Sequence, residues 1–143
     1  MPPLHPAVVH FPIALLSLAA ALRLWVALSP REWLEATARL CLWLGSMTLA
    51  AAVLTGQATT PHPLPPAAAE IFRWHQQLGF TTLLWYGGLS LWEIRHVTSI
   101  TMGRRRALAA AHIVGSLLLL STAFFGGRLV YEFGVGTPTT GLR

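Results

Sequence analysis

The chain has 143 residues, of which 54% are apolar and only 10% are charged. Such a composition is typical of proteins embedded in a bilayer and argues against a soluble globular domain. All ten basic residues are arginine, which we attribute to genome composition, so the pI of about 11.1 is not interpreted as nucleic-acid binding. The only cysteine, Cys41, excludes a disulfide or a CxxC redox pair within one chain.

Four apolar runs fill most of the chain, and each is long enough to cross about 30 Å of hydrocarbon as a helix. Backbone groups in lipid must be hydrogen-bonded within their own segment, so we expect helices instead of open strands. The runs cover residues 7–28, 36–56, 71–93 and 107–131. They predict an all-α fold, an integral membrane four-helix bundle in which residues 1–143 form a single four-span domain in contact with lipid.

The first run opens with two histidines and two prolines in the stretch LHPAVVHFPIALL, residues 4–16. No basic segment precedes it and no small-residue cleavage pattern follows, so we interpret it as a permanent span and not as a signal peptide. Pro6 suits the first turn of a helix, whereas Pro12 requires a regular helix that begins near His10 or a bend there. A bend would direct His10 inward.

The second run shares a spacing of small residues with the fourth run. In each, a Gly-Ser pair is followed after nine residues by another glycine: Gly45, Ser46 and Gly56 in one, Gly115, Ser116 and Gly126 in the other. His10 and His75 likewise fall just inside the same end of the first and third spans. Two helical hairpins related by an axis along the membrane normal would explain both observations, and chance similarity is the alternative.

The fourth run carries two local features near its end. Glu132 lies one helical turn after Arg128, a spacing at which opposite charges pair on one helix face. Beyond it, Gly134 and Gly136 can adopt the left-handed conformation that ends many helices. We therefore expect an ion pair and a helix C-terminus in this region.

The arginines predict the orientation of the spans. Seven of them flank the loops between the first and second spans and between the third and fourth: Arg23, Arg31, Arg39, Arg95, Arg104, Arg105 and Arg106. Only Arg73, Arg128 and Arg143 lie on the opposite side. By the positive-inside rule both loops are cytoplasmic and both termini lie outside, which in a bacterium means an inner-membrane protein with periplasmic termini.

His10 and His75 are expected at a similar depth, roughly 6 Å inside the outer ends of two parallel spans. Two imidazoles on neighbouring helices can ligate haem iron from both faces, which predicts a haem b site with these two axial ligands. Gly79, one turn after His75, would leave room for the macrocycle, and Arg73 and Arg128 could pair with its propionates. The alternatives are hydrogen bonding at helix ends, glycine used for helix packing, and arginines that snorkel.

The remaining histidines give weaker patterns. His5 and His62 are expected on the outer side, where a divalent metal could recruit them with His10, although no HxxxH spacing is present. His112 lies about 9 Å into the fourth span, whereas His96 is at the very end of the third, and this mismatch in depth argues against a second, inner haem. We expect His112 to hydrogen-bond across helices and His96 to lie at the interface.

The two ends of the chain resemble the signatures of a bacterial four-helix membrane family known mainly as a domain of unknown function. That family begins with HPxxVHFPIAL and ends with GGxLVYxHGVGV, and the corresponding stretches here read HPAVVHFPIALL and GGRLVYEFGVG. The residues at motif positions are His5, Pro6, His10, Phe11, Pro12, Gly126, Gly127, Tyr131, Gly134 and Gly136, and His75 matches a histidine expected near the start of the third span. Phe133 departs from the family, which often has histidine there, so a metal or proton role of that position is absent.

The resemblance implies a four-helix membrane protein that holds haem b or serves as a membrane partner of redox proteins. With the histidines, it favours a membrane-embedded b-type haem module that transfers electrons near the periplasmic face. The alternatives are a cofactor-free structural subunit of a larger membrane complex and, less favoured, a proton or metal transporter, for which four spans are few without an oligomer. The sequence lacks aspartate for a Ser/His/Asp triad and lacks a phosphate-binding glycine motif, so an independent enzyme is not indicated.

Overall fold

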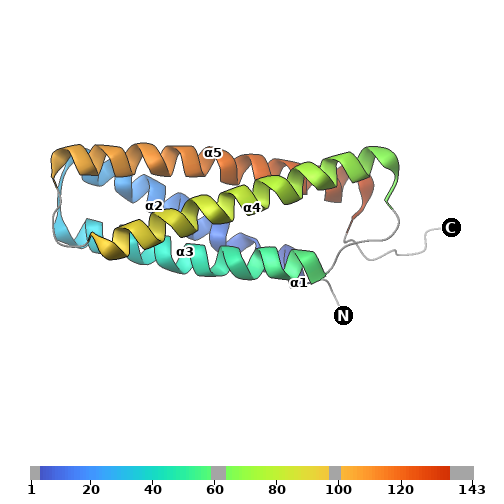
Figure 1. The fold of residues 1–143 in the computed structure, drawn as a ribbon, viewed down its shortest axis with the longest axis horizontal. Helices are drawn as coiled ribbons and strands as arrows, with labels where there is room; N and C mark the ends of the chain where they lie inside the picture. Colours follow the sequence, from blue (N-terminus) through green and yellow to red (C-terminus); the bar gives the residue numbers. More distant parts are fainter. Residues whose placement is uncertain (1–3, 59–63, 97–100, 136–143) are drawn as a thin grey trace.

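The computed structural model describes residues 4–58, 64–96 and 101–135. These residues form helices and no strand: α1 (Leu4–Val8), α2 (His10–Leu28), α3 (Glu32–Ala58), α4 (Pro66–Arg95) and α5 (Met102–Phe133). The four long helices lie side by side, and α1 is a short helix ahead of α2 (Figure 1). The predicted all-α helical bundle is therefore confirmed.

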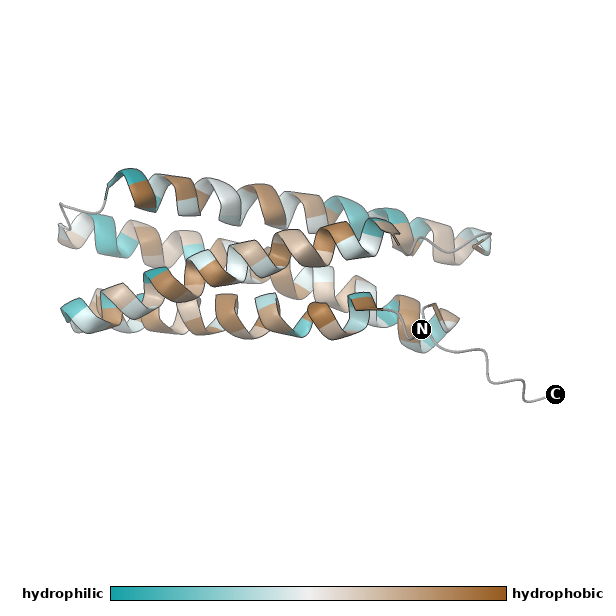
Figure 2. Ribbon diagram, turned by 90° about the horizontal axis from the view of Figure 1, so that it is seen from below, coloured by the Kyte–Doolittle hydropathy of each residue, from teal (hydrophilic) through white to brown (hydrophobic). Residues whose placement is uncertain are grey.

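Three segments of the described chain are long and apolar enough to cross a membrane: Leu4–Leu28, Glu32–Ala58 and Met102–Phe133. α4 has 30 residues, which is ample length, but glutamines, glycines, tryptophans and a tyrosine interrupt its apolar residues, and it falls short of the hydropathy of the other three. Hydrophobic residues run along the middle of the bundle, and hydrophilic residues gather toward its ends (Figure 2). The pattern of the whole bundle suits a membrane better than α4 does by itself.

The long helices form a ring in the order α2, α3, α4, α5. α2 packs against α3 and α5, and α4 packs against the same two helices, whereas no close backbone approach joins α2 to α4 or α3 to α5 in the described residues. α2 ends and α3 begins at the end of the bundle where α4 ends and α5 begins (Figure 1). The core between the helices is made mainly of leucines with one buried tyrosine: Leu16, Leu34, Leu42, Leu49, Tyr86 and Leu119.

Local sequence sets the helix ends. α2 begins at His10, as Pro12 predicted, so the proline lies in the first turn, where its missing N–H leaves no hydrogen bond unmade. The Thr101 side chain caps α5 by accepting a hydrogen bond from the backbone N–H of Arg104. Gly134 ends α5 with a φ of 64°, which confirms the predicted left-handed conformation at this position. The helices extend beyond the predicted spans because these caps, and not hydropathy, fix their ends.

The two helical hairpins, α2 with α3 and α4 with α5, use glycine for close packing in the same way. An added Cβ at Gly45 would lie 2.6 Å from Cδ2 of Leu16, and one at Gly115 would lie 2.6 Å from Cζ of Tyr86. Gly115 follows Gly45 by 70 residues, and Tyr86 follows Leu16 by the same 70 residues. This equivalence supports the predicted relation between the hairpins and gives its offset.

Candidate functional site

A cavity of about 440 Å³ lies at the end of the bundle where α1 and α4 begin and where α3 and α5 end. We call it the histidine cavity, because His5, His10 and His75 line it together with Gly79 and largely apolar residues. Its volume falls among sites that hold small ligands and cofactors, about 300 to 1,000 Å³. The fold therefore gathers several residues that the sequence had singled out.

His5 belongs to α1 but is held against α3. Its Nδ1 lies 2.9 Å from the carbonyl oxygen of Ala52 and 3.4 Å from Oγ1 of Thr55. Gly56, one turn after Ala52, leaves the space that the ring needs, since an added Cβ would lie 3.0 Å from Cε1 of His5. A carbonyl oxygen can only accept a hydrogen bond, so Nδ1 donates to Ala52 and Nε2 keeps its lone pair in the neutral ring.

His75 of α4 is held against α5 in the same manner. Its Nδ1 donates to the carbonyl oxygen of Thr122 at 2.9 Å, and an added Cβ at Gly126 would lie 2.8 Å from Cε1 of the ring. Each histidine precedes the residue whose carbonyl it bonds by 47 positions. Two equivalent halves, one from each hairpin, therefore build the histidine cavity.

The rings of His5 and His75 face each other. Their centroids are 6.3 Å apart, and their planes are inclined by 74°. Because both Nδ1 atoms are hydrogen-bonded to carbonyl groups, the nitrogens with a lone pair are the two Nε2 atoms, as in metal-ligating histidines that a backbone carbonyl orients. Two metal–nitrogen bonds of about 2 Å each fit within the distance between the ring centres.

Residues 1–139 match the model of a family described as a predicted membrane protein, DUF2231. The chain belongs to the DUF2231 family. This match confirms the resemblance to a membrane protein family of unknown function. No curated protein and no solved structure matches the chain.

In this DUF2231 protein, His10 is oriented differently from the expectation. It lines the histidine cavity, but its side chain is exposed, whereas the expected bend would have directed it inward. His10 follows His5 by five residues, which is about 140° around a helix axis, so a helix start that turns His5 inward turns His10 away. The histidine that faces His75 is His5. The 70-residue offset between Gly56 and Gly126, applied to His75, would have identified it from the sequence.

The other residues of the predicted haem site are arranged less closely. Gly79 is buried, and an added Cβ there would meet only Cγ2 of Thr122 at 3.8 Å, so space is left beside it. Arg73 is exposed and, like Arg128, does not belong to the cavity lining. Arg128 donates from Nε and Nη2 to the carboxylate of Glu132 at 2.7 and 2.8 Å, which confirms the predicted pair. The propionate role of Arg73 and Arg128 stays a prediction.

The remaining histidines form no metal site in the described part of the chain, which contains no group of three or more His, Cys, Asp or Glu side chains able to hold an ion. His62 lies outside the described residues. His112 is fully buried, but its Nδ1 bonds the carbonyl oxygen of Leu108, so the expected hydrogen bond across helices is wrong. The carbonyl group one turn earlier in its own helix is the acceptor within reach. His96 is exposed, as expected for a residue at the interface.

Proposed function

We propose that the protein is a membrane-embedded b-type haem module that transfers electrons near the periplasmic face of a bacterial inner membrane. The observation that carries this proposal is the opposed pair of His5 and His75 in a largely apolar cavity, each tied through Nδ1 to a helix carbonyl. Histidine is a common axial ligand of haem iron, and cofactor sites in bundles are built from side chains on facing helices. Haem b, when bound, would supply one-electron chemistry, and this chain would supply ligation and apolar surroundings.

Both the sequence pattern and the cavity geometry support His75 as one axial ligand. His5 is the favoured second ligand because its ring faces that of His75. His10, the second ligand expected from the sequence, lines the same cavity and is the alternative. The space beside Gly79 would accommodate part of a flat macrocycle next to His75.

The propionates would lie toward the periplasmic surface, where Arg73 and Arg128 could bind them by charge-assisted hydrogen bonds. The exposed side chain of Arg73 suits this role, whereas Arg128 would have to share its guanidinium with Glu132. A redox protein or a larger membrane complex would exchange electrons at this end of the bundle, and lipid would surround the helices.

Absorption spectroscopy of protein purified from haem-replete cells tests the proposal. Reduction should give Soret and alpha bands, and a pyridine haemochrome assay should identify haem b. His75→Ala should abolish the bands, and a comparison of His5→Ala with His10→Ala identifies the second ligand. His96→Ala is the matched control, because this exposed histidine hydrogen-bonds a carbonyl of its own helix and should be dispensable for haem.

A colourless preparation from such cells would overturn the haem proposal. Stable His5→Ala and His75→Ala variants that still co-purify with a larger complex would then support a cofactor-free structural subunit. Proton or metal flux into liposomes that His75→Ala abolishes would instead support a transporter.

A further inference from the structure

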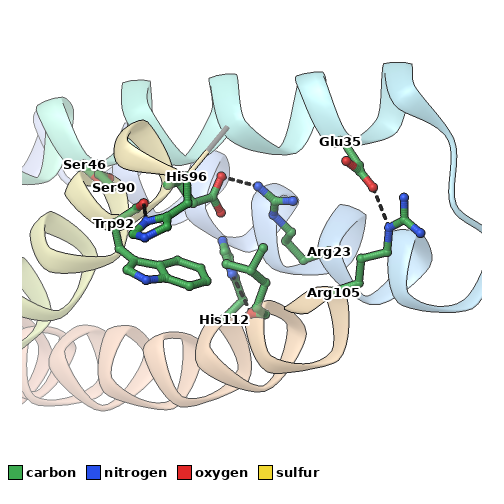
Figure 3. A network of polar contacts seen from close by, with 10 residues as sticks. Arg23, Glu35, Ser46, Ser90, Trp92, His96, Arg105 and His112 are labelled. Atoms are coloured by element: carbon green, nitrogen blue, oxygen red, sulfur yellow. Dashed lines mark hydrogen bonds and ion pairs between the residues drawn. The ribbon is translucent and has the colours of Figure 1, made fainter. Parts of the chain in front are cut away.

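Two ion pairs lie at the end of the bundle opposite the histidine cavity (Figure 3). Arg23 of α2 donates to a carboxylate oxygen of Glu93 in α4, and both side chains are almost fully buried, with 2% and 1% exposed. Arg105 of α5 donates from Nε to Oε1 of Glu35 in α3 at 2.7 Å. Each pair joins two helices that do not pack directly against each other, so both pairs cross the interior of the bundle along its diagonals.

The partners of each ion pair are 70 residues apart, the same offset that relates the two hairpins. Residues at equivalent positions of a two-fold repeat meet only where they lie near its axis. His5 and His75, at the other end of the bundle, also differ by 70 positions and also meet. The pseudo-two-fold axis therefore passes near the histidine pair and near both ion pairs.

Opposite charges at equivalent positions distinguish one hairpin from the other. If two copies of the first hairpin paired in this arrangement, Arg23 would meet Arg23 and Glu35 would meet Glu35. Two copies of the second hairpin would bring Glu93 to Glu93 and Arg105 to Arg105. Buried like charges repel at low dielectric and would strongly disfavour both arrangements. The equivalent glycine contacts, which are alike in both hairpins, provide no such discrimination.

We propose that the Arg23–Glu93 and Glu35–Arg105 pairs are a pairing code that joins the first hairpin to the second and rejects a copy of the same hairpin. The code ensures that the histidine cavity receives one half from each hairpin. A buried ion pair is often no more stabilising than apolar side chains of similar volume, and charges in a membrane interior are costly. Specificity of pairing is what such charges add.

Charge reversal in the full chain tests the code without any bound cofactor. R23E and E93R each bring like charges together and should lower the midpoint of thermal unfolding in detergent. R23E/E93R restores opposite charges and should recover at least half of that loss. R128E and R128E/E132R are the matched controls, because they change an exposed Arg–Glu pair within one helix, and they should shift the midpoint little.

Co-purification of two differently tagged full chains gives a second readout. R23E should capture E93R, because each first hairpin then finds an oppositely charged second hairpin in the other chain, and R23E should not capture another R23E chain. The code is overturned if the double reversal is no more stable than the single reversals. It is also overturned if R23E captures R23E as efficiently as it captures E93R.

Discussion

His5 and His75 face each other with ring centroids 6.3 Å apart, although they belong to different hairpins and lie 70 residues apart in the chain. Each ring rests on two supports from a neighbouring helix, a carbonyl oxygen that accepts from Nδ1 and a glycine one turn later. Because the supports are equivalent in the two hairpins, substitutions at either glycine should disturb the histidine cavity.

Gly126→Ala should displace the His75 ring. The added Cβ would lie 2.8 Å from Cε1, so the ring must move and lose its hydrogen bond to Thr122. Such overpacking costs about 1–3 kcal/mol and should lower both the unfolding midpoint and the Soret absorbance per protein. Gly127→Ala is the control, since nothing lies within 4 Å of its added Cβ. Identical spectra and midpoints for the two variants would refute the proposed support.

Gly115→Ala should destabilise the α4–α5 hairpin. Its Cβ would lie 2.6 Å from Cζ of Tyr86, a fully buried side chain, and we expect a loss of about 1–3 kcal/mol in the free energy of unfolding. Gly88→Ala meets nothing within 4 Å and should be neutral or should stabilise the helix by up to about 1 kcal/mol. Unfolding followed by circular dichroism measures both, and a Gly115→Ala variant as stable as the unmodified chain would contradict the close contact.

His112→Leu should preserve or increase stability. His112 is the equivalent of Leu42, 70 residues earlier, and both side chains are fully buried. Nε2 of His112 has no hydrogen-bond partner among the described residues, and an unpaired buried polar atom costs about 1–3 kcal/mol. The reciprocal substitution, Leu42→His, should destabilise the protein. If His112→Leu lowers the unfolding midpoint, Nε2 has a partner such as a buried water.

Bound haem should raise the stability of the folded protein. A ligand present at about 100 times its Kd, and bound only by the folded state, adds about 2.7 kcal/mol. Protein prepared from haem-replete cells should therefore unfold at a higher temperature than haem-depleted protein, and His75→Ala should remove the difference. Equal midpoints at stoichiometric haem content would argue that the haem is bound nonspecifically.

The sequence by itself determined the features that depend on neighbours along one helix. Apolar runs predict helices because lipid offers the backbone no other hydrogen-bond partner. Four residues separate Arg128 from Glu132, which is enough to predict their pairing on one helix face. Pro12 required a helix that begins near His10, and Gly134 supplied a residue able to end α5. Each of these inferences uses only contacts within one turn or two.

Only the tertiary structure decided which side chains meet across helices. From the sequence, His10 was the expected partner of His75, and Arg23 was interpreted as a charge beside a loop, whereas the fold turns His5 toward His75 and buries Arg23 against Glu93. The reason is geometric. Each residue turns the side-chain direction by about 100° around a helix, so contacts between helices depend on how each helix is rotated and how the hairpins dock, which hydropathy along the chain does not fix.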